Sequence, residues 1–314
     1  MGMDKDIFKK NVAIMAKVSE EEERFLPHSD SLLPSVDVLR EIVDLVKVIV
    51  FPGFFDRRQI DSNIRSYHIG VNMERLQQLL GQQIELALLF ANGKDTQPSA
   101  TSNELALKFI DRLPGIKRLL YTDVEAIYND DPAAHSYSEV IFCYPVVMAM
   151  IHYRTAHELL TMGIPVIPRI ITELAHANTG IDIHPGARIG EYFSIDHGTG
   201  VVIGETCIIG NHVTLYQGVT LGAKNYKLEG ALDQHQHPAC CPMHKEDIPA
   251  AFPRHPIIED HVTIYSNSTL LGRITIGHDT VIGGNIWLTH SVPAHSRILQ
   301  GKTQDLIFNG GLGI

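Results

Sequence analysis

The sequence predicts an α+β multidomain protein, with an N-terminal all-helical domain at 1–178 followed by a left-handed parallel β-helix of hexapeptide repeats at 179–300. Three observations predict this fold. Apolar residues recur at helical spacing in the first half, aliphatic residues recur every six positions in the second, and an excursion loop at 223–254 interrupts the second pattern. With 314 residues and 44% hydrophobic content, the chain is long enough to bury a sizeable core. The last residues, 301–314, are expected to form a flexible C-terminal tail.

The first half carries helical periodicity that is broken by turn signals. Apolar residues at three- and four-residue steps predict helices at 36–50, 74–90, 103–113, 116–128 and 146–162. Pro114 and Gly115 are expected to separate the third helix from the fourth, because a proline inside a helix has no N–H to donate. The last helix carries His152, Arg154 and His157, and we interpret it as a core helix with one polar edge.

The second half carries a period that fits neither a helix nor an ordinary strand. Fourteen aliphatic residues lie at six-residue steps in three series: Ile183, Ile189, Ile195 and Val201; Ile203, Ile209, Leu215 and Leu221; and Ile258, Ile264, Leu270, Ile276, Ile282 and Leu288. Such a repeat is typical of a parallel β-helix, whose aliphatic side chains stack inward from coil to coil. The phase slips by two residues between the first series and the second. Because a narrow solenoid has no deep cavity, an active site is expected between subunits or under the loop at 223–254.

Charge and cysteine usage exclude several classes of protein. The formal net charge is −10, so neither a nucleic acid nor an anionic membrane surface is an expected partner. No stretch is apolar over the roughly 20 residues that a membrane-spanning helix needs. The four cysteines, two of them adjacent, do not make a disulfide framework at this length. These observations favour a cytoplasmic protein.

Polar clusters interrupt the repeats at three points. They are Asp182-Ile183-His184-Pro185-Gly186, Asp196-His197-Gly198-Thr199-Gly200 and Arg254-His255-Pro256. The second lies where the phase slips, and its Asp-His pair with two glycines predicts a side chain presented at a subunit face. An imidazole titrates near neutral pH and can act as a general base, whereas a guanidinium binds carboxylates through paired hydrogen bonds.

Four runs of sequence carry a resemblance to a known family. They are DIHPGARIG, DHGTGVVIGET, YQGVTLGA and RHPIIEDHVTI, and the similarity extends over 131–292. In this order they resemble the serine O-acetyltransferases, which are hexapeptide-repeat acyltransferases. The resemblance implies transfer of acetyl from acetyl-CoA to the L-serine hydroxyl, giving O-acetyl-L-serine and CoA in cysteine biosynthesis.

The resemblance implies a catalytic pair in which His197 is the general base and Asp182 holds its imidazole in the right tautomer. Spacing alone leaves this pairing open. The two residues are 15 positions apart, whereas three six-residue sides return after about 18 residues, so the two need not stack directly.

The resemblance also implies a site for an amino acid. Asp131 and Asp196 are implied to bind the substrate ammonium, and His255 to contact the substrate. Arg254 suits the substrate carboxylate, because its planar guanidinium matches a carboxylate in two hydrogen bonds. Since Asp131 belongs to the helical domain, that domain is expected to cap the site.

Acetyl-CoA is implied as a co-substrate, with no permanently bound cofactor. It is implied to lie along a groove near Gly222 and Ala223 and near Gly283 and Gly284, although many relatives carry a second glycine where this chain has Ala223. The loop holds His235, His237, Cys240, Cys241 and His244. Because this spacing lacks the CxxC of a zinc knuckle, no metal ligand is assigned and the loop is interpreted as a cover for the substrate.

The implied partners follow from the fold and the family. Flat solenoid faces predict a homotrimer or a dimer of trimers. The family implies L-cysteine as a feedback inhibitor, and O-acetylserine sulfhydrylase as a partner that binds the C-terminal Ile314. Three alternatives stay open: a hexapeptide acetyltransferase for a sugar or antibiotic hydroxyl, a zinc-dependent solenoid carbonic anhydrase, and a non-catalytic scaffold for the sulfhydrylase.

Overall fold

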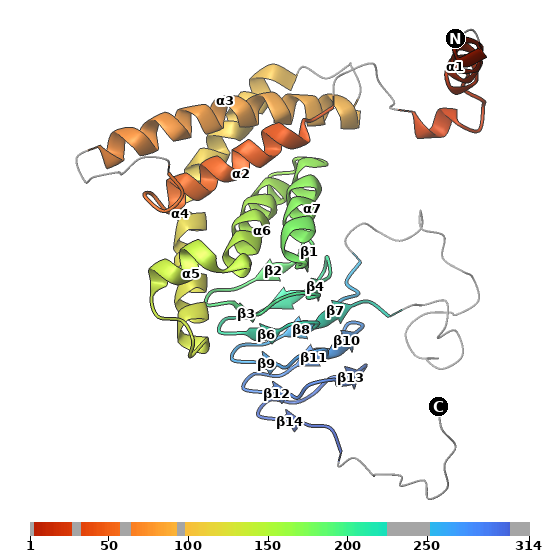
Figure 1. The fold of residues 1–314 in the computed structure, drawn as a ribbon. Coiled ribbons are helices and arrows are strands. Elements are labelled where there is room, and N and C mark those ends of the chain that lie inside the picture. The colour runs from red at the N-terminus through yellow and green to blue at the C-terminus, as the bar shows by residue number, and fades with distance from the viewer. Residues whose placement is uncertain (1–2, 27–32, 57–63, 93–97, 225–251, 302–314) are drawn as a thin grey trace, which may run out of the picture.

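The computed structural model describes residues 3–26, 33–56, 64–92, 98–224 and 252–301 (Figure 1). Within these ranges the helices are α1 Met3–Met15, η1 Glu23–Phe25, α2 Val36–Val50, α3 Arg65–Asn92, α4 Pro98–Asp130, α5 Tyr137–Cys143, α6 Pro145–Thr161 and α7 Ile167–Thr179. The strands are β1 Asp182–Ile183, β2 Arg188–Ile189, β3 Ser194–Asp196, β4 Val202–Ile203, β5 Ile208–Ile209, β6 Thr214–Tyr216, β7 Thr220–Gly222, β8 Ile257–Ile258, β9 Thr263–Ile264, β10 Thr269–Leu271, β11 Thr275–Ile276, β12 Val281–Ile282, β13 Trp287–Leu288 and β14 Arg297–Ile298. The predicted order, helices first and a left-handed parallel β-helix second, is confirmed.

Helix α2 shows how local sequence and packing act together. Its N-cap is Ser35, whose hydroxyl accepts a hydrogen bond from the backbone N–H of Val38 at 3.4 Å. Leu39, Ile42 and Val46 recur at helical spacing and are fully buried, so the stripe that predicts the helix is also the stripe that packs.

The predicted break at Pro114 is wrong, because the two expected helices form the single helix α4 with Pro114 inside it. A proline in a helix interior costs about 3 kcal/mol. The apolar stripe nevertheless runs through the break, and each of its side chains is at most 4% exposed: Phe109, Leu113, Ile116, Leu120 and Val124. Burying each such side chain contributes about 1.5–3 kcal/mol, so packing outweighs the local cost.

The β-helix is a triangular prism with three parallel sheets as its faces. We name them face 1 (β1, β4, β7, β10, β13), face 2 (β2, β5, β8, β11) and face 3 (β3, β6, β9, β12, β14). The chain passes from face 1 to face 2 to face 3 and back, so the prism has a 1–2 corner, a 2–3 corner and a 3–1 corner. All fourteen aliphatic residues of the hexapeptide series are buried, which confirms the predicted stacking.

The slip in phase arises because the first coil is two residues longer than the second. Ile183 pairs with Ile203, which lies 20 residues later, whereas Val202 pairs with Thr220, 18 residues later. The two extra residues are accommodated in the bend after β3, at the 3–1 corner. The sequence His197-Gly198-Thr199-Gly200 is therefore lifted out of the regular stack.

The helices close the N-terminal end of the prism, where the backbone groups of the first coil have no preceding coil to pair with (Figure 1). Helix α6 supplies the partners. The hydroxyl of Tyr153 donates to the carbonyl of Ala187 at 2.7 Å, and Arg154 donates to the carbonyls of Ile189 at 3.1 Å and Gly190 at 2.8 Å. Of the predicted polar edge, Arg154 is thus buried against the solenoid and His157 contacts the carbonyl of Pro185 at 2.8 Å, whereas His152 lies toward α2 and α7.

Arg154 also joins α6 to α4 through a buried ion pair. Its Nε and one terminal nitrogen donate to the two carboxylate oxygens of Asp123 at 2.7 and 2.8 Å, and Asp123 accepts a further bond from the N–H of Phe193 at 3.3 Å. The two side chains are 4% and 2% exposed. One charged pair therefore connects two helices and the first coil.

Arg154→Met should lower the free energy of unfolding by about 3–5 kcal/mol, because it leaves the carboxylate of Asp123 buried without its cation. Chemical denaturation of the full chain measures this loss.

Arg118→Met is the matched control. Arg118 also joins α4 to the first coil, through Glu191 at 2.7 Å, but these side chains are 60% and 37% exposed. Its removal should cost less than about 1 kcal/mol. Equal losses in the two variants would contradict the role assigned to Arg154.

Candidate active site

The ten residues predicted for the site gather at the two corners that bound face 1. Asp196, His197, Gly283 and Gly284 lie on the 3–1 corner, and Asp182 begins β1 directly after it. Arg254, His255, Gly222 and Ala223 lie on the 1–2 corner, where the chain leaves for the loop and returns. Asp131 follows α4, and its pKa is lowered by the hydrogen bonds of Tyr144 and Ala133 and, last, by the nearby His197.

Asp131 is held ionised by its neighbours at the 3–1 corner. The hydroxyl of Tyr144 donates to one carboxylate oxygen at 2.6 Å, and the N–H of Ala133 donates to the other at 2.8 Å. These two hydrogen bonds lower the pKa of Asp131, chiefly through Tyr144, because they stabilise the charged form. The same bond raises the pKa of Tyr144 to about 12. The neighbouring Asp130 accepts a hydrogen bond from Thr214 of β6 at 2.8 Å, which fixes the end of α4 against face 3.

His197 projects from this corner, with 71% of its side chain exposed. Its Nδ1 lies 3.7 Å from a carboxylate oxygen of Asp196. The bend that presents it depends on Gly198, whose φ is +91° and where an added Cβ would come within 2.6 Å of Ile181. The imidazole thus stands outside its own coil, beside two carboxylates and open to a ligand or a neighbouring chain.

Asp182 has other neighbours in the single chain. One of its carboxylate oxygens, a ring nitrogen of His176 and a carboxylate oxygen of Glu173 lie within 4.8 Å of one another. The described residues contain no hydrogen bond or ion pair between Asp182 and His197. The predicted catalytic pair therefore stays a prediction.

His255 is fixed at the 1–2 corner by Thr206. The backbone N–H and the hydroxyl of Thr206 lie 3.1 and 2.9 Å from Nδ1 of His255. The same hydroxyl oxygen accepts the backbone N–H groups of Arg254 at 2.9 Å and His255 at 3.1 Å, so its own hydrogen is free to point at Nδ1. Since a backbone N–H can only donate, Nδ1 is the unprotonated nitrogen and Nε2 carries the proton.

Burial, and then the adjacent Arg254, lower the pKa of His255 to about 4. His255 is therefore neutral at neutral pH and presents a single N–H donor at Nε2. Its ring lies against Gly204, where a Cβ would come within 2.0 Å of the imidazole. Only glycine leaves room for the ring at this position.

Arg254 is oriented by Glu205, whose carboxylate forms a short ion pair with its guanidinium. The two side chains are 28% and 30% exposed, so the guanidinium keeps an accessible edge. This corner therefore offers a cation beside a neutral donor, a combination that suits a carboxylate ligand.

The residues predicted to contact acetyl-CoA are divided between the same two corners as the other predicted site residues. Gly222 ends β7 and pairs with Leu271, and Ala223 follows it at the 1–2 corner. Gly283 and Gly284 follow β12 at the 3–1 corner, the corner that carries His197. Within one chain they therefore lie at different corners of the prism.

Some predicted features lie outside the described residues. These are most of the excursion loop with its cluster His235, His237, Cys240, Cys241 and His244, and the tail that ends in Ile314.

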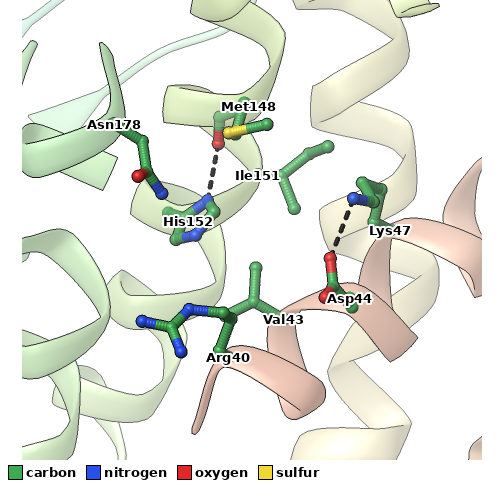
Figure 2. A pocket seen from close by; sticks show the side chains of 8 residues that line it. All are labelled: Arg40, Val43, Asp44, Lys47, Met148, Ile151, His152 and Asn178. Carbon is green, nitrogen blue, oxygen red and sulfur yellow. Dashed lines mark hydrogen bonds and ion pairs between the residues drawn. The ribbon is translucent and has the colours of Figure 1, made fainter. Parts of the chain in front are cut away.

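Away from the two corners, a hollow of about 110 Å³ lies between α2, α6 and α7 (Figure 2). It is lined in part by Arg40, Lys47 and His152. The Nδ1 of His152 donates to the carbonyl of Met148 at 2.8 Å, and burial lowers the pKa of this histidine. None of the predicted site residues lines this hollow, so it is not the candidate active site.

Two residues of the site escaped the sequence analysis. Tyr144 contacts Asp131 from 13 positions away, and nothing in its surrounding sequence IFCYP indicates that contact. Thr206 does belong to the DHGTGVVIGET run, but its role depends on the chain returning 48 residues later. Of the two residues, only Tyr144 lacked any signal in the sequence.

Comparison with known proteins decides the family. A scan against models of protein families returned no match. The chain is 43% identical over 316 aligned residues to the curated protein named "Serine acetyltransferase, plasmid" from Synechococcus elongatus, covering 96% of this chain and 94% of that protein. This chain belongs to the serine acetyltransferase family. It is therefore an acyltransferase, which sets aside the carbonic anhydrase and scaffold alternatives.

Solved structures agree with this assignment. Serine acetyltransferase isoform 3 from Entamoeba histolytica, crystallised in complex with cysteine, is 31% identical and superimposes with a TM-score of 0.69 over 91% of this chain and 86% of that one. Serine acetyltransferase 1 of the same organism, in complex with L-cysteine, is 34% identical with a TM-score of 0.68 over 86% of this chain and 90% of that one. Among the described residues, no helix is both long and apolar enough to cross a membrane.

Thr206→Val should raise the KM for serine about tenfold while leaving the KM for acetyl-CoA unchanged. The substitution keeps the side-chain shape but removes the hydroxyl that positions Arg254 and His255, and one lost hydrogen bond of this kind contributes about 1–1.5 kcal/mol. Steady-state kinetics with each substrate varied in turn measure the two constants.

Thr206→Ser is the control, because it keeps the hydroxyl and loses only the methyl group. It should restore the KM for serine. A normal KM for serine in Thr206→Val would contradict the assigned positioning role, and a raised KM in Thr206→Ser alone would show that Thr206 acts through packing.

Proposed function

We propose that this serine acetyltransferase transfers the acetyl group of acetyl-CoA directly to the hydroxyl of L-serine, with His197 as the general base. The observation that carries the proposal is the position of His197. It is an exposed imidazole, lifted from the coil by two extra residues, with Nδ1 3.7 Å from a carboxylate oxygen of Asp196 and with Asp131 near enough to interact with it electrostatically. The products are O-acetyl-L-serine and CoA.

The chemistry needs a base because a serine hydroxyl is a weak nucleophile at neutral pH. The neutral imidazole removes the hydroxyl proton as the oxygen attacks the thioester carbonyl. The carbon–sulfur bond then breaks, and the imidazolium returns the proton to the departing CoA thiolate. No acyl-enzyme is formed, so proton transfer and positioning account for the catalysis.

Recognition of serine as a zwitterion matches the charges at the two corners. Asp131 and Asp196 supply carboxylates for the ammonium group. Arg254 and the Nε2–H of His255 supply donors for the carboxylate. A sugar hydroxyl offers neither charge, so this arrangement favours an amino acid over the alternative acceptors.

The two corners belong to different subunits in the assembled site. A six-residue side at about 3.3 Å per residue separates them by about 20 Å on one prism, which is far longer than serine. We therefore propose a homotrimer, alone or paired into a dimer of trimers, in which the 3–1 corner of one chain faces the 1–2 corner of the next. The acetyl-CoA groove would run between the same two corners, along Gly283 and Gly284 on one side and Gly222 and Ala223 on the other.

His197→Asn should lower kcat by about 10²–10⁴-fold with little change in either KM, because it removes the base but not the substrate contacts. Asparagine is the substitute of choice, since residue 197 has a φ of +58° that asparagine tolerates. Release of the CoA thiol from acetyl-CoA in the presence of serine measures turnover. His212→Asn is the matched control, because residue 212, at the 2–3 corner, has a φ of +56°. It should retain full activity, whereas unchanged turnover in His197→Asn would remove His197 from the mechanism.

Mixing two inactive variants tests the shared site. His197→Asn damages the 3–1 corner and Arg254→Ala damages the 1–2 corner, so a trimer that contains both can form some intact interfaces. Random co-assembly of equal amounts should recover about a quarter of wild-type activity, since each interface needs an undamaged corner from both chains. A mixture as inactive as its two components would place the whole site within one chain.

The remaining partners follow from the same site. L-cysteine carries the charges of serine with a thiol in place of the hydroxyl, so we propose that it competes for the serine pocket as a feedback inhibitor. The cysteine bound in the Entamoeba histolytica enzymes supports this assignment.

We further propose that the C-terminal Ile314 binds O-acetylserine sulfhydrylase. We also propose that the enzyme works in the cytoplasm, with acetyl-CoA as a co-substrate rather than a resident cofactor.

A further inference from the structure

A cluster of imidazoles and carboxylates occupies the 2–3 corner, the one corner of the prism that the proposed active site does not use. His278 and Asp279 lie between β11 and β12, and His295 lies one coil further on, before β14. The Nδ1 of His278 lies 2.7 Å from a carboxylate oxygen of Asp279, and the Nδ1 of His295 lies 3.6 Å from the same oxygen. The three side chains are 49%, 46% and 71% exposed.

We propose that His278, Asp279 and His295 bind a divalent transition-metal ion of the zinc type, which joins the last two coils of the β-helix. The three donor atoms already lie within 4.8 Å of one another. Two imidazoles and one carboxylate form a ligand set that Zn²⁺ accepts, with water in the fourth position. Two nitrogen ligands make the set a poor match for Mg²⁺ or Ca²⁺, which prefer oxygen.

The backbone holds these ligands in register. The N–H of His295 donates to the carbonyl of His278 at 2.9 Å, and the N–H of Asp279 donates to the carbonyl of Asp260 at 3.1 Å. Consecutive coils therefore fix the spacing of the two backbone positions that carry the imidazoles.

The surroundings attract a cation. A hollow of about 330 Å³ beside the cluster is lined by Glu259, Asp260, His261 and His278. The side chain of Glu259 accepts the backbone N–H of His278 at 2.9 Å, and Asp260 accepts the N–H of Asn211 at 2.7 Å, so both are held in place at the corner. The three carboxylates of Glu259, Asp260 and Asp279 favour a cation at this corner, because they raise the local concentration of divalent ions.

The position of the cluster suggests what the metal does. β14 is the last strand of the described residues, so the coil that carries His295 has a neighbouring coil on one side only. Terminal units of a solenoid have fewer stabilising contacts than internal ones. A metal shared by the last two coils supplies a cross-link at that end, at a corner remote from the residues proposed for catalysis.

Calorimetric titration of the chelator-treated full chain with ZnCl₂ tests the proposal. The wild type should bind one Zn²⁺ at this cluster with a micromolar Kd, and the melting temperature should rise when Zn²⁺ is added. His295→Asn and Asp279→Asn should each weaken that binding at least tenfold and remove the thermal shift. Asparagine is used because residues 279 and 295 have φ of +55° and +60°.

Three controls separate this site from other ligands. His290→Ala removes another exposed histidine and should bind Zn²⁺ like the wild type. Substitution of Co²⁺ distinguishes nitrogen and oxygen ligands from the thiolates of Cys240 and Cys241, because only thiolates add an intense charge-transfer band. MgCl₂ should produce no thermal shift. Equal binding of Zn²⁺ by the wild type and both asparagine variants, or binding only at millimolar Zn²⁺, would overturn the proposal. These readouts do not depend on acetyltransferase activity, so they stand apart from the test of the proposed function.

Discussion

The contact between Arg154 and Asp123 is the interaction on which the arrangement of this molecule depends. A parallel β-helix ends in a coil whose backbone groups lack partners, and that end must be covered. Arg154 covers it by donating to the carbonyls of Ile189 and Gly190 while it neutralises Asp123. A buried ion pair adds little net stability compared with apolar packing, but its geometry is exacting. Here that geometry fixes the positions of α4 and α6 on the prism.

The position of α4 in turn places a residue of the site. Asp131 follows directly after the end of α4, two turns beyond Asp123, so a rotation of α4 would move its carboxylate away from His197. The other half of the site depends on a different anchor. Thr206 fixes Arg254 and His255 where the chain returns from the loop. The two halves are thus organised separately, one by packing of the helices and one by a hydroxyl in the second coil.

The sequence predicted much of this because the repeat is local. Six-residue spacing of residues such as Ile203 and Ile209 determines the stack, and the two-residue slip marks the bend at His197. The prediction of a helix break at Pro114 was wrong, because local helix propensity does not include the packing of Ile116 and Leu120, which follow the proline in the same helix. Contacts such as Tyr144 with Asp131, or Thr206 with His255, join segments whose proximity only the folded chain determines. The family motifs identified the residues, but the anchors that orient them had no periodic signal.

Dividing the site between two corners has an electrostatic consequence. Asp131 and Asp196 lie on one corner and Arg254 on the other, so within one chain they do not neutralise each other across the proposed substrate pocket. Arg254 instead pairs with Glu205 at the edge of its corner, and Asp131 is satisfied by the neutral donors Tyr144 and Ala133. The carboxylate of Asp131 therefore keeps its charge uncompensated, whereas Arg254 shares its charge with Glu205 and offers a ligand the accessible edge of its guanidinium. In the proposed trimer a zwitterionic amino acid is the ligand that bridges them, because its ammonium and carboxylate match the two halves, and selection for serine then follows from how the chains assemble.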